Sequence, residues 1–223
     1  MEIEENIRNS KNFSWLLSSV FVILFYTWIY YIVNPGIDIT SETLVFILIN
    51  VSFLFVISVL IIVQIVNAII AVKRGDVYYC LKGLLFFKYT LIPATLIFIA
   101  LSLMILGAGV SVSIVLMMFP GGIIIAPFLA AISFLLPPVL LTIIFVAALP
   151  GLVCGICAII LTKKKQNIGW GQVILHIILQ LIPVADLIDA LVISISYWKM
   201  GKVLAIVSAT AFIAGGILAA INL

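Results

Sequence analysis

Residues 89–162 contain no Asp, Glu, Lys, Arg or His. A water-soluble domain cannot hide an uncharged apolar stretch of that length, because charged and polar side chains must cover most of its surface. The whole chain is 66% hydrophobic and 9% charged, whereas an ordinary soluble domain is about 25% charged. The sequence therefore predicts an all-α protein that lies in a membrane.

The apolar segments predict a polytopic helical membrane protein with about six transmembrane helices, since one span needs about 20 apolar residues. We expect residues 1–223 to form a single integral membrane domain. The expected spans are residues 13–33, 44–72, 93–117, 139–161, 172–198 and 203–222.

Proline is concentrated in the uncharged stretch, where six of the eight prolines lie between Pro93 and Pro150. Proline removes a backbone donor and breaks or kinks a helix. We therefore expect a proline-broken, irregular apolar segment between spans three and four. The alternative is two long kinked helices joined at Pro120.

The distribution of charge predicts the orientation. The loop around residues 34–43 carries two acids and no Lys or Arg, whereas residues 73–88 carry four basic residues. Because basic loops stay on the cytoplasmic side, we expect a cytoplasmic N-terminus. The isoleucine-rich composition and compact loops indicate a bacterial plasma membrane. If residues 172–198 and 203–222 both cross fully, Lys199 and Lys202 are the only basic residues on the outer side. The alternative is that residues 172–198 form a re-entrant or interfacial hairpin.

The segment 172–198 holds the ionisable residues that lie deepest in apolar sequence, namely His176, Asp186 and Asp189. A charged side chain at the centre of a bilayer costs about 2.5–3.5 kcal/mol on the insertion scale. The segment must therefore turn its acids toward protein or a water-filled cavity.

The acids allow two interpretations. Asp186 and Asp189 are neighbours on one helix face, and Pro183 upstream breaks the backbone, as at the cation or proton sites of many secondary transporters. Alternatively, Asp186 is the N-cap of a helix that follows Pro183. Gln180 belongs to the same candidate pathway. His176 lies about 15 Å from Asp186 along a continuous helix, so we expect no direct contact between them.

A second polar stripe follows span two, where Asn50, Gln64 and Asn67 share one helix face. Interhelical hydrogen bonds explain such residues, at about 0.6 kcal/mol each. If a solute pathway exists, we expect these three side chains to line it together with Asp186 and Asp189.

Small residues mark another helix, which carries Gly151, Cys154, Gly155 and Cys157. The Cys-x-x-Cys spacing is typical of redox exchange, but a membrane relay needs a second thiol pair, which Cys80 alone cannot supply. The Gly151 and Gly155 spacing more simply predicts close helix packing, with the cysteines as small fillers.

The inventory of side chains argues against an enzyme. One histidine is too few for a metal-type intramembrane protease, and no Gly-x-Ser-Gly indicates a serine site. We expect no cofactor, no metal and no nucleic-acid partner. The expected partners are the lipid bilayer and either other membrane proteins or a second copy. Two hypotheses stay open: a small secondary transporter or permease, and a non-transporting accessory, immunity or assembly subunit.

Overall fold

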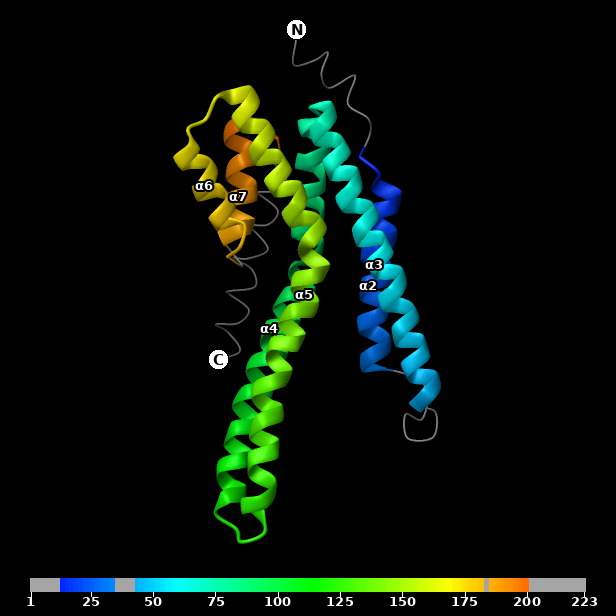
Figure 1. Ribbon diagram of the computed structural model, residues 1–223, viewed down its shortest axis with the longest axis vertical. Helices are drawn as coiled ribbons and strands as arrows, with labels where there is room; N and C mark the ends of the chain where they lie inside the picture. Colours follow the sequence, from blue (N-terminus) through cyan, green and yellow to red (C-terminus); the bar gives the residue numbers. More distant parts are fainter. Residues whose placement is uncertain (1–12, 35–42, 183–184, 201–223) are drawn as a thin grey trace, which may run out of the picture. The chain divides into compact units, whose positions relative to one another are not determined.

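The computed structural model describes residues 13–34, 43–182 and 185–200, which form helices and no strand (Figure 1). Long apolar runs without charge explain why helices dominate, because a helix satisfies its own backbone hydrogen bonds. The elements are α2 (Trp15–Val33), α3 (Thr43–Arg74), α4 (Val77–Met117), α5 (Gly122–Gln166), α6 (Trp170–Leu179), α7 (Ala185–Val192) and the π-helix η1 (Ile193–Tyr197).

Four of the described helices, α2 to α5, are long and apolar enough to cross a membrane. They contain 19, 32, 41 and 45 residues, so α4 is about 62 Å long and α5 about 68 Å long at 1.5 Å per residue. This agrees with a polytopic helical membrane protein. The expected first two spans correspond to α2 and α3, whereas the expected span 203–222 lies outside the described residues.

The expected irregular segment between spans three and four is wrong. Helix α4 runs on to Met117 and α5 begins at Gly122, so the alternative of two long helices joined at Pro120 is confirmed. In an apolar setting, each further broken backbone bond is costly, so the helix continues through its prolines. Gly122 permits the turn, because a Cβ there would lie 1.9 Å from the carbonyl oxygen of Leu116.

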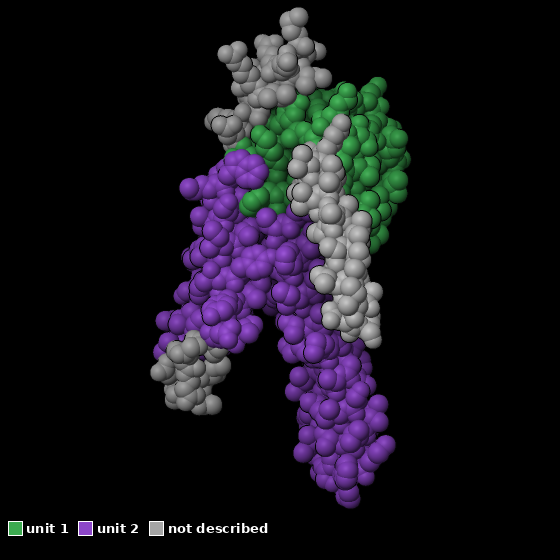
Figure 2. Space-filling view, turned by 180° about the vertical axis from the view of Figure 1, so that it is seen from behind, with its two compact units in different colours: residues 1–13, 65–88, 150–223 green, residues 14–64, 89–149 purple. Residues whose placement is uncertain are grey.

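The chain forms two compact units (Figure 2). Unit 1 comprises residues 1–13, 65–88 and 150–223, and unit 2 comprises residues 14–64 and 89–149. Every described charged side chain belongs to unit 1. The described part of unit 2 is held together by apolar contacts and by hydrogen bonds between uncharged groups.

Helix α2 packs against α3 within unit 2. The indole nitrogen of Trp28 donates a 3.0 Å hydrogen bond to Oδ1 of Asn50. The amide nitrogen of Gln64 donates to Oγ of Ser18 at 3.2 Å, and both side chains are buried. These two bonds fix the register of α2 on α3.

Helix α2 also reaches α4 inside unit 2. The hydroxyl of Tyr26 donates a 2.8 Å hydrogen bond to the carbonyl oxygen of Thr90. Its oxygen also accepts a bond from the backbone N–H of Ala94, whose own ladder partner is Thr90. Because Pro93 interrupts the ladder at this level, Tyr26 supplies bonds at the site of the interruption.

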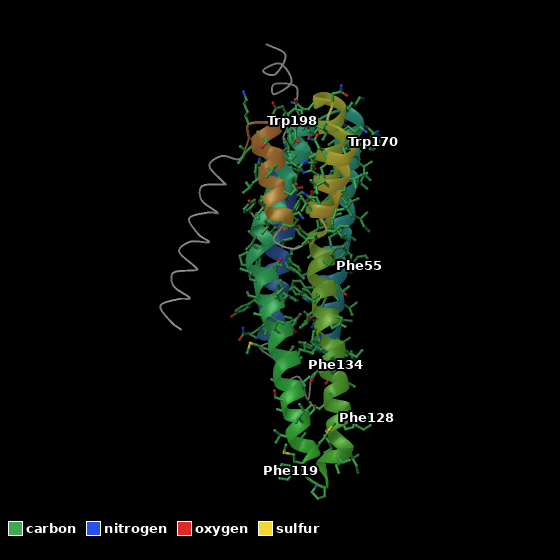
Figure 3. All side chains as sticks on the ribbon, turned by 90° about the vertical axis from the view of Figure 1, so that its left-hand side faces the viewer. Phe55, Phe119, Phe128, Phe134, Trp170 and Trp198 are labelled. Atoms are coloured by element: carbon green, nitrogen blue, oxygen red, sulfur yellow. The ribbon has the colours of Figure 1, made fainter. Side chains whose placement is uncertain are left out.

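Within unit 2, α4 and α5 pack against each other through small residues. A Cβ placed on Gly109 would lie 1.7 Å from Oγ and 2.6 Å from Cβ of Ser133, so the two backbones approach closely there. On the outer faces, Phe119, Phe128 and Phe134 are exposed (Figure 3). Large exposed apolar side chains suit contact with lipid chains.

We expect Gly109→Ala to destabilise the packing of α4 on α5 by about 1–3 kcal/mol, because Ser133 and its backbone must move to admit the methyl group. Gly107→Ala is the matched control, since nothing lies within 4 Å of a Cβ at Gly107. Thermal unfolding of the detergent-solubilised protein measures both. Equal melting temperatures for the two variants would contradict the close approach at Gly109.

Unit 1 packs the first turns of α4 and the last turns of α5 with α6, α7 and η1. The segment 172–198 is not one span: α6 ends at Leu179, the chain turns at residues 180–182, and α7 returns along α6. The expected single crossing helix is therefore wrong. Folding back lets the polar residues of the two arms pair with each other instead of facing lipid. Pro183 itself lies outside the described residues.

The two ends of the folded-back segment meet beside the end of α5. The amide nitrogen of Gln166 donates to the carbonyl oxygen of Tyr197, and the indole nitrogen of Trp198 donates a 2.8 Å bond to Oγ1 of Thr162. With 10 residues, α6 is about 15 Å long, half of a hydrocarbon core about 30 Å thick. We call residues 170–198 the hairpin.

Candidate functional site

A carboxylate, an imidazole and an amide meet inside the hairpin. Nδ1 of His176 lies 2.5 Å from Oδ1 of Asp189, and the amide nitrogen of Gln180 donates a 2.7 Å hydrogen bond to Oδ2. His176 is 7% exposed, Asp189 is 3% exposed and Gln180 is 2% exposed. Both carboxylate oxygens are therefore paired, which is what burial of a carboxylate requires.

The two arms of the hairpin position these groups. His176 and Gln180 are four residues apart, so both lie on the face of α6 that meets α7. Asp189 comes from the middle of α7, and η1 begins four residues later. The ring of Tyr197 packs edge-on against that of His176, with centroids 6.0 Å apart. A π-helix beside buried polar groups is frequent at functional sites.

An ion pair lies near the start of α7. Lys88 of α4 binds Oδ2 of Asp186 through its ammonium group, and the two side chains are 5% and 17% exposed. Asp186 is not an N-cap, because α7 begins at Ala185 and the carboxylate is directed to Lys88. Its place in the first turn still favours the negative charge, since a helix N-terminus is partly positive.

The two acids therefore do not share one site: Asp186 binds Lys88, and Asp189 binds His176 and Gln180. His176 bonds to Asp189, because the chain folds back and does not form the continuous helix from which its distance to Asp186 was reckoned. Sequence reasoning missed Lys88, which is 98 residues from Asp186. Its position directly before the uncharged stretch was the only local signal.

Close packing on α5 supports the same region. A Cβ on Gly155 would lie 2.6 Å from Oε1 of Gln180, and one on Gly151 would lie 3.0 Å from Cβ of Phe87. These glycines thus let α5 approach α4 and the end of α6. Oε1 of Gln180 is buried without a hydrogen-bond partner among the described residues. Its close approach to the backbone of Gly155 fits a weak Cα–H···O contact.

The polar stripe of α3 divides between the units. Asn50 and Gln64 belong to unit 2, where each makes a hydrogen bond to α2, as the packing alternative predicts. Asn67 belongs to unit 1 and is half-buried. The contacts of Asp186 and Asp189 are described within unit 1, and those of Asn50 and Gln64 within unit 2.

The three cysteines are free and buried. Cys80 on α4 lies beside Cys157 on α5, and Cys154 lies against Gly83. The contact between Cys80 and Cys157 was not visible in the Cys-x-x-Cys spacing. Among the described residues, no three His, Cys, Asp or Glu side chains are grouped to hold a metal ion.

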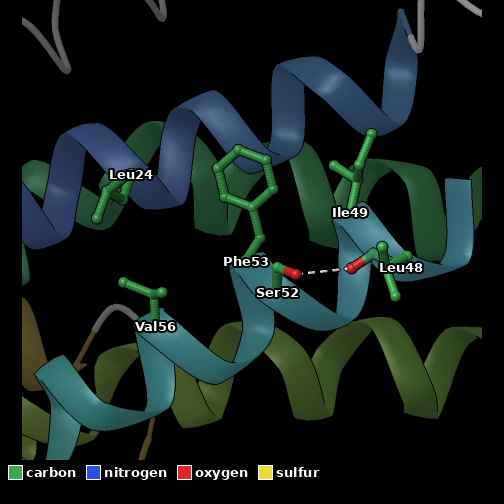
Figure 4. A pocket seen from close by; sticks show the side chains of 6 residues that line it. All are labelled: Leu24, Leu48, Ile49, Ser52, Phe53 and Val56. Atoms are coloured by element: carbon green, nitrogen blue, oxygen red, sulfur yellow. Dashed lines mark hydrogen bonds between the residues drawn. The ribbon is translucent and has the colours of Figure 1, made fainter. Parts of the chain in front are cut away.

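Unit 2 has a groove of about 270 Å³ between α2 and α3 (Figure 4). The hydroxyl of Ser52 in this groove donates to the carbonyl oxygen of Leu48 at 2.8 Å, so it is already engaged. The groove offers a ligand apolar contacts and no charge. Its lining residues are Leu24, Leu48, Ile49, Ser52, Phe53 and Val56.

We call His176, Gln180 and Asp189, together with Lys88 and Asp186, the buried cluster of unit 1. This cluster is the part of the described chain that can bind and release a proton. Lys88 and Asp186 cancel each other's charge. The His176 and Asp189 pair is neutral when it holds one exchangeable proton, on either residue, and carries one negative charge without it.

A family of unknown function (DUF6652) matches residues 10–199. The chain belongs to this family.

The DUF6652 match includes both buried networks and all described helices from α2 to η1. It ends before the expected span 203–222. No curated protein and no solved structure matches the chain. The family has no known function, so the function must be inferred from the buried cluster.

Proposed function

We propose that the protein is a multi-pass, non-enzymatic membrane protein of the bacterial plasma membrane that works as a small proton-linked secondary transporter. The observation that carries this proposal is the buried contact between His176 and Asp189 at the crossing of two short helices. Intramembrane ionisable residues are costly, and they typically mark ion or proton pathways. Helices interrupted near the coordinating groups are also typical of secondary transporters.

Proton binding gives the hairpin two charge states. Histidine is the side chain that ordinarily titrates between pH 5 and 8. When the pair loses its proton, Asp189 keeps a negative charge that only Gln180 and the imidazole N–H can stabilise. The two arms of the hairpin then attract each other differently in the two states, which is the differential interaction that coupling to a rearrangement requires.

The charges of unit 1 support a cytoplasmic N-terminus. Phe13 packs against Tyr79 with ring centroids 5.4 Å apart, and both residues belong to unit 1. The basic residues at the ends of α3 and α5 belong to this same unit. Because Trp198 bonds to the end of α5, this contact supports a position of Lys199 on the same side as the basic end of α5.

An accessory or assembly subunit is the second candidate. Asn50 and Gln64 are engaged in interhelical hydrogen bonds, and the described part of unit 2 carries no charge with which to line a polar pathway. In that case the buried cluster holds the hairpin together, and the outer apolar faces bind another membrane protein or a second copy.

A pH jump on a solid-supported membrane carrying the reconstituted protein tests the proposal with the proton as the only probe. Proton binding within the bilayer moves charge, so the wild-type protein should give a transient current. We expect Asp189→Asn to reduce it at least ten-fold. Asp76→Asn is the matched control, because Asn keeps the acceptor that caps the backbone N–H of Tyr79. A folded wild-type protein without current would exclude a proton site and favour the accessory subunit.

A further inference from the structure

Five exposed cations gather at the helix ends of unit 1. They lie in the last turn of α3, in the last turn of α5 and directly after η1. We call them the basic rim. Its members are Lys73, Arg74, Lys164, Lys165 and Lys199.

Trp198 makes contacts beside the helix ends that carry the rim. Its ring packs edge-on against that of Tyr78, with centroids 6.1 Å apart, and Tyr78 follows Arg74 by four residues. Its indole N–H is bound to Thr162 near the end of α5, and the ammonium of Lys165 lies 5.9 Å from its ring. The cations of α3, α5 and η1 therefore face one end of unit 1.

Among the described residues, few acids lie near the rim in sequence. Asp76 is the described acid nearest to it in sequence, and Oδ1 of Asp76 accepts a hydrogen bond from the backbone N–H of Tyr79. The two other described acids, Asp186 and Asp189, are engaged in the buried networks. The rim thus keeps an excess of positive charge at the surface.

Aromatic side chains place the rim at a membrane surface. Trp170, at the start of α6, is 71% exposed and lies against the ammonium of Lys163. Tryptophan and tyrosine prefer the level of the lipid headgroups, where basic side chains meet anionic lipids. The cations follow the C-terminal ends of α3 and α5, which expose carbonyl groups, not N–H donors. Such ends do not form the compact backbone cradle that a single free phosphate ion favours.

We propose that the basic rim binds the phosphate headgroups of anionic phospholipids, which hold this end of the protein at the membrane surface. This binding is independent of the proton site, because none of the five cations belongs to either buried network. It requires exposed charge of one sign beside apolar helices and an aromatic belt, and unit 1 presents all three.

Native mass spectrometry of the detergent-solubilised full chain, with phosphatidylglycerol and phosphatidylcholine as competing probes, tests this proposal. The wild-type protein should retain phosphatidylglycerol at least ten-fold better than phosphatidylcholine. Each basic residue near an anionic surface contributes about five-fold, so K164Q/K165Q should lose up to about 25-fold, which removes the preference. The charge-conserving K164R/K165R variant is the matched control and should keep it.

Equal melting temperatures of the wild-type protein and both double variants would show that they are folded, since the two lysines are exposed. Equal retention of the two lipids by the wild-type protein would overturn the proposal, and so would full selectivity in K164Q/K165Q. Displacement of phosphatidylglycerol by millimolar inorganic phosphate would also overturn it, because it would indicate a site for the free ion. If K164Q/K165Q alone is less stable than the wild type, the single variant Lys165→Gln replaces it in the test. Lys165→Gln should lose about five-fold of the preference for phosphatidylglycerol.

Discussion

Replacing Lys88 by Met should lower the free energy of unfolding by about 3 kcal/mol or more, because it leaves the carboxylate of Asp186 buried without its counter-ion. Lys88 belongs to α4 and Asp186 to α7, so the loss of stability should weaken the packing of the hairpin against α4. Reversible unfolding of the detergent-solubilised protein, followed by helical circular dichroism, measures the change.

The double variant Lys88→Met/Asp186→Leu is the control for this prediction. Removing both charges leaves no buried ion, so the double variant should recover most of the lost stability. A Lys88→Met protein as stable as the wild type would contradict a buried ion pair. Equal losses in the single and double variants would mean that Lys88 stabilises the fold by packing alone.

Asp189→Leu should have a similarly large effect, about 2–5 kcal/mol, because it leaves the polar atoms of His176 and Gln180 buried and unpaired. Asp189→Asn should cost less, since an amide still accepts from Gln180 and donates to a neutral imidazole. Thermal unfolding of both variants in one detergent measures the difference.

The two substitutions of Asp189 separate a structural role from a proton site. A purely structural role predicts that Asn preserves both the fold and any activity. The proposed proton site predicts that Asn preserves the fold and abolishes the pH-jump current. If Leu and Asn destabilise the protein equally, the hydrogen bonds to Asp189 do not hold the hairpin as described.

The sequence predicted the elements that depend on local pattern. Helices α2 and α3 follow from uninterrupted apolar runs, and their ends fall close to the expected bounds. An irregular segment was expected between α4 and α5 because six prolines lie between Pro93 and Pro150, with two long kinked helices as the alternative. The helices continue through the prolines that they contain because broken backbone bonds are costly in apolar surroundings, and Tyr26 accepts a hydrogen bond from Ala94 beside Pro93.

The candidate site was predicted in part for a related reason. Because burying polar groups in a membrane is costly, the sequence predicted that His176, Gln180, Asp186 and Asp189 face protein or a water-filled cavity. Their partners could not be predicted, because pairing depends on the fold of the hairpin and not on spacing along one helix. The bond between Lys88 and Asp186 spans 98 positions, and no local pattern reports a contact of that range.

Side-specific thiol labelling in intact cells tests the folded-back hairpin most directly. In a background with all three cysteines replaced by Ala, Gly169→Cys marks the start of the hairpin and Lys199→Cys marks its end. Phe119→Cys in the turn between α4 and α5 marks the opposite end of α5. We predict that positions 169 and 199 react with a membrane-impermeant maleimide only after permeabilisation, whereas position 119 reacts from outside. Labelling of position 199 but not 169 from outside would contradict the hairpin and restore a full crossing.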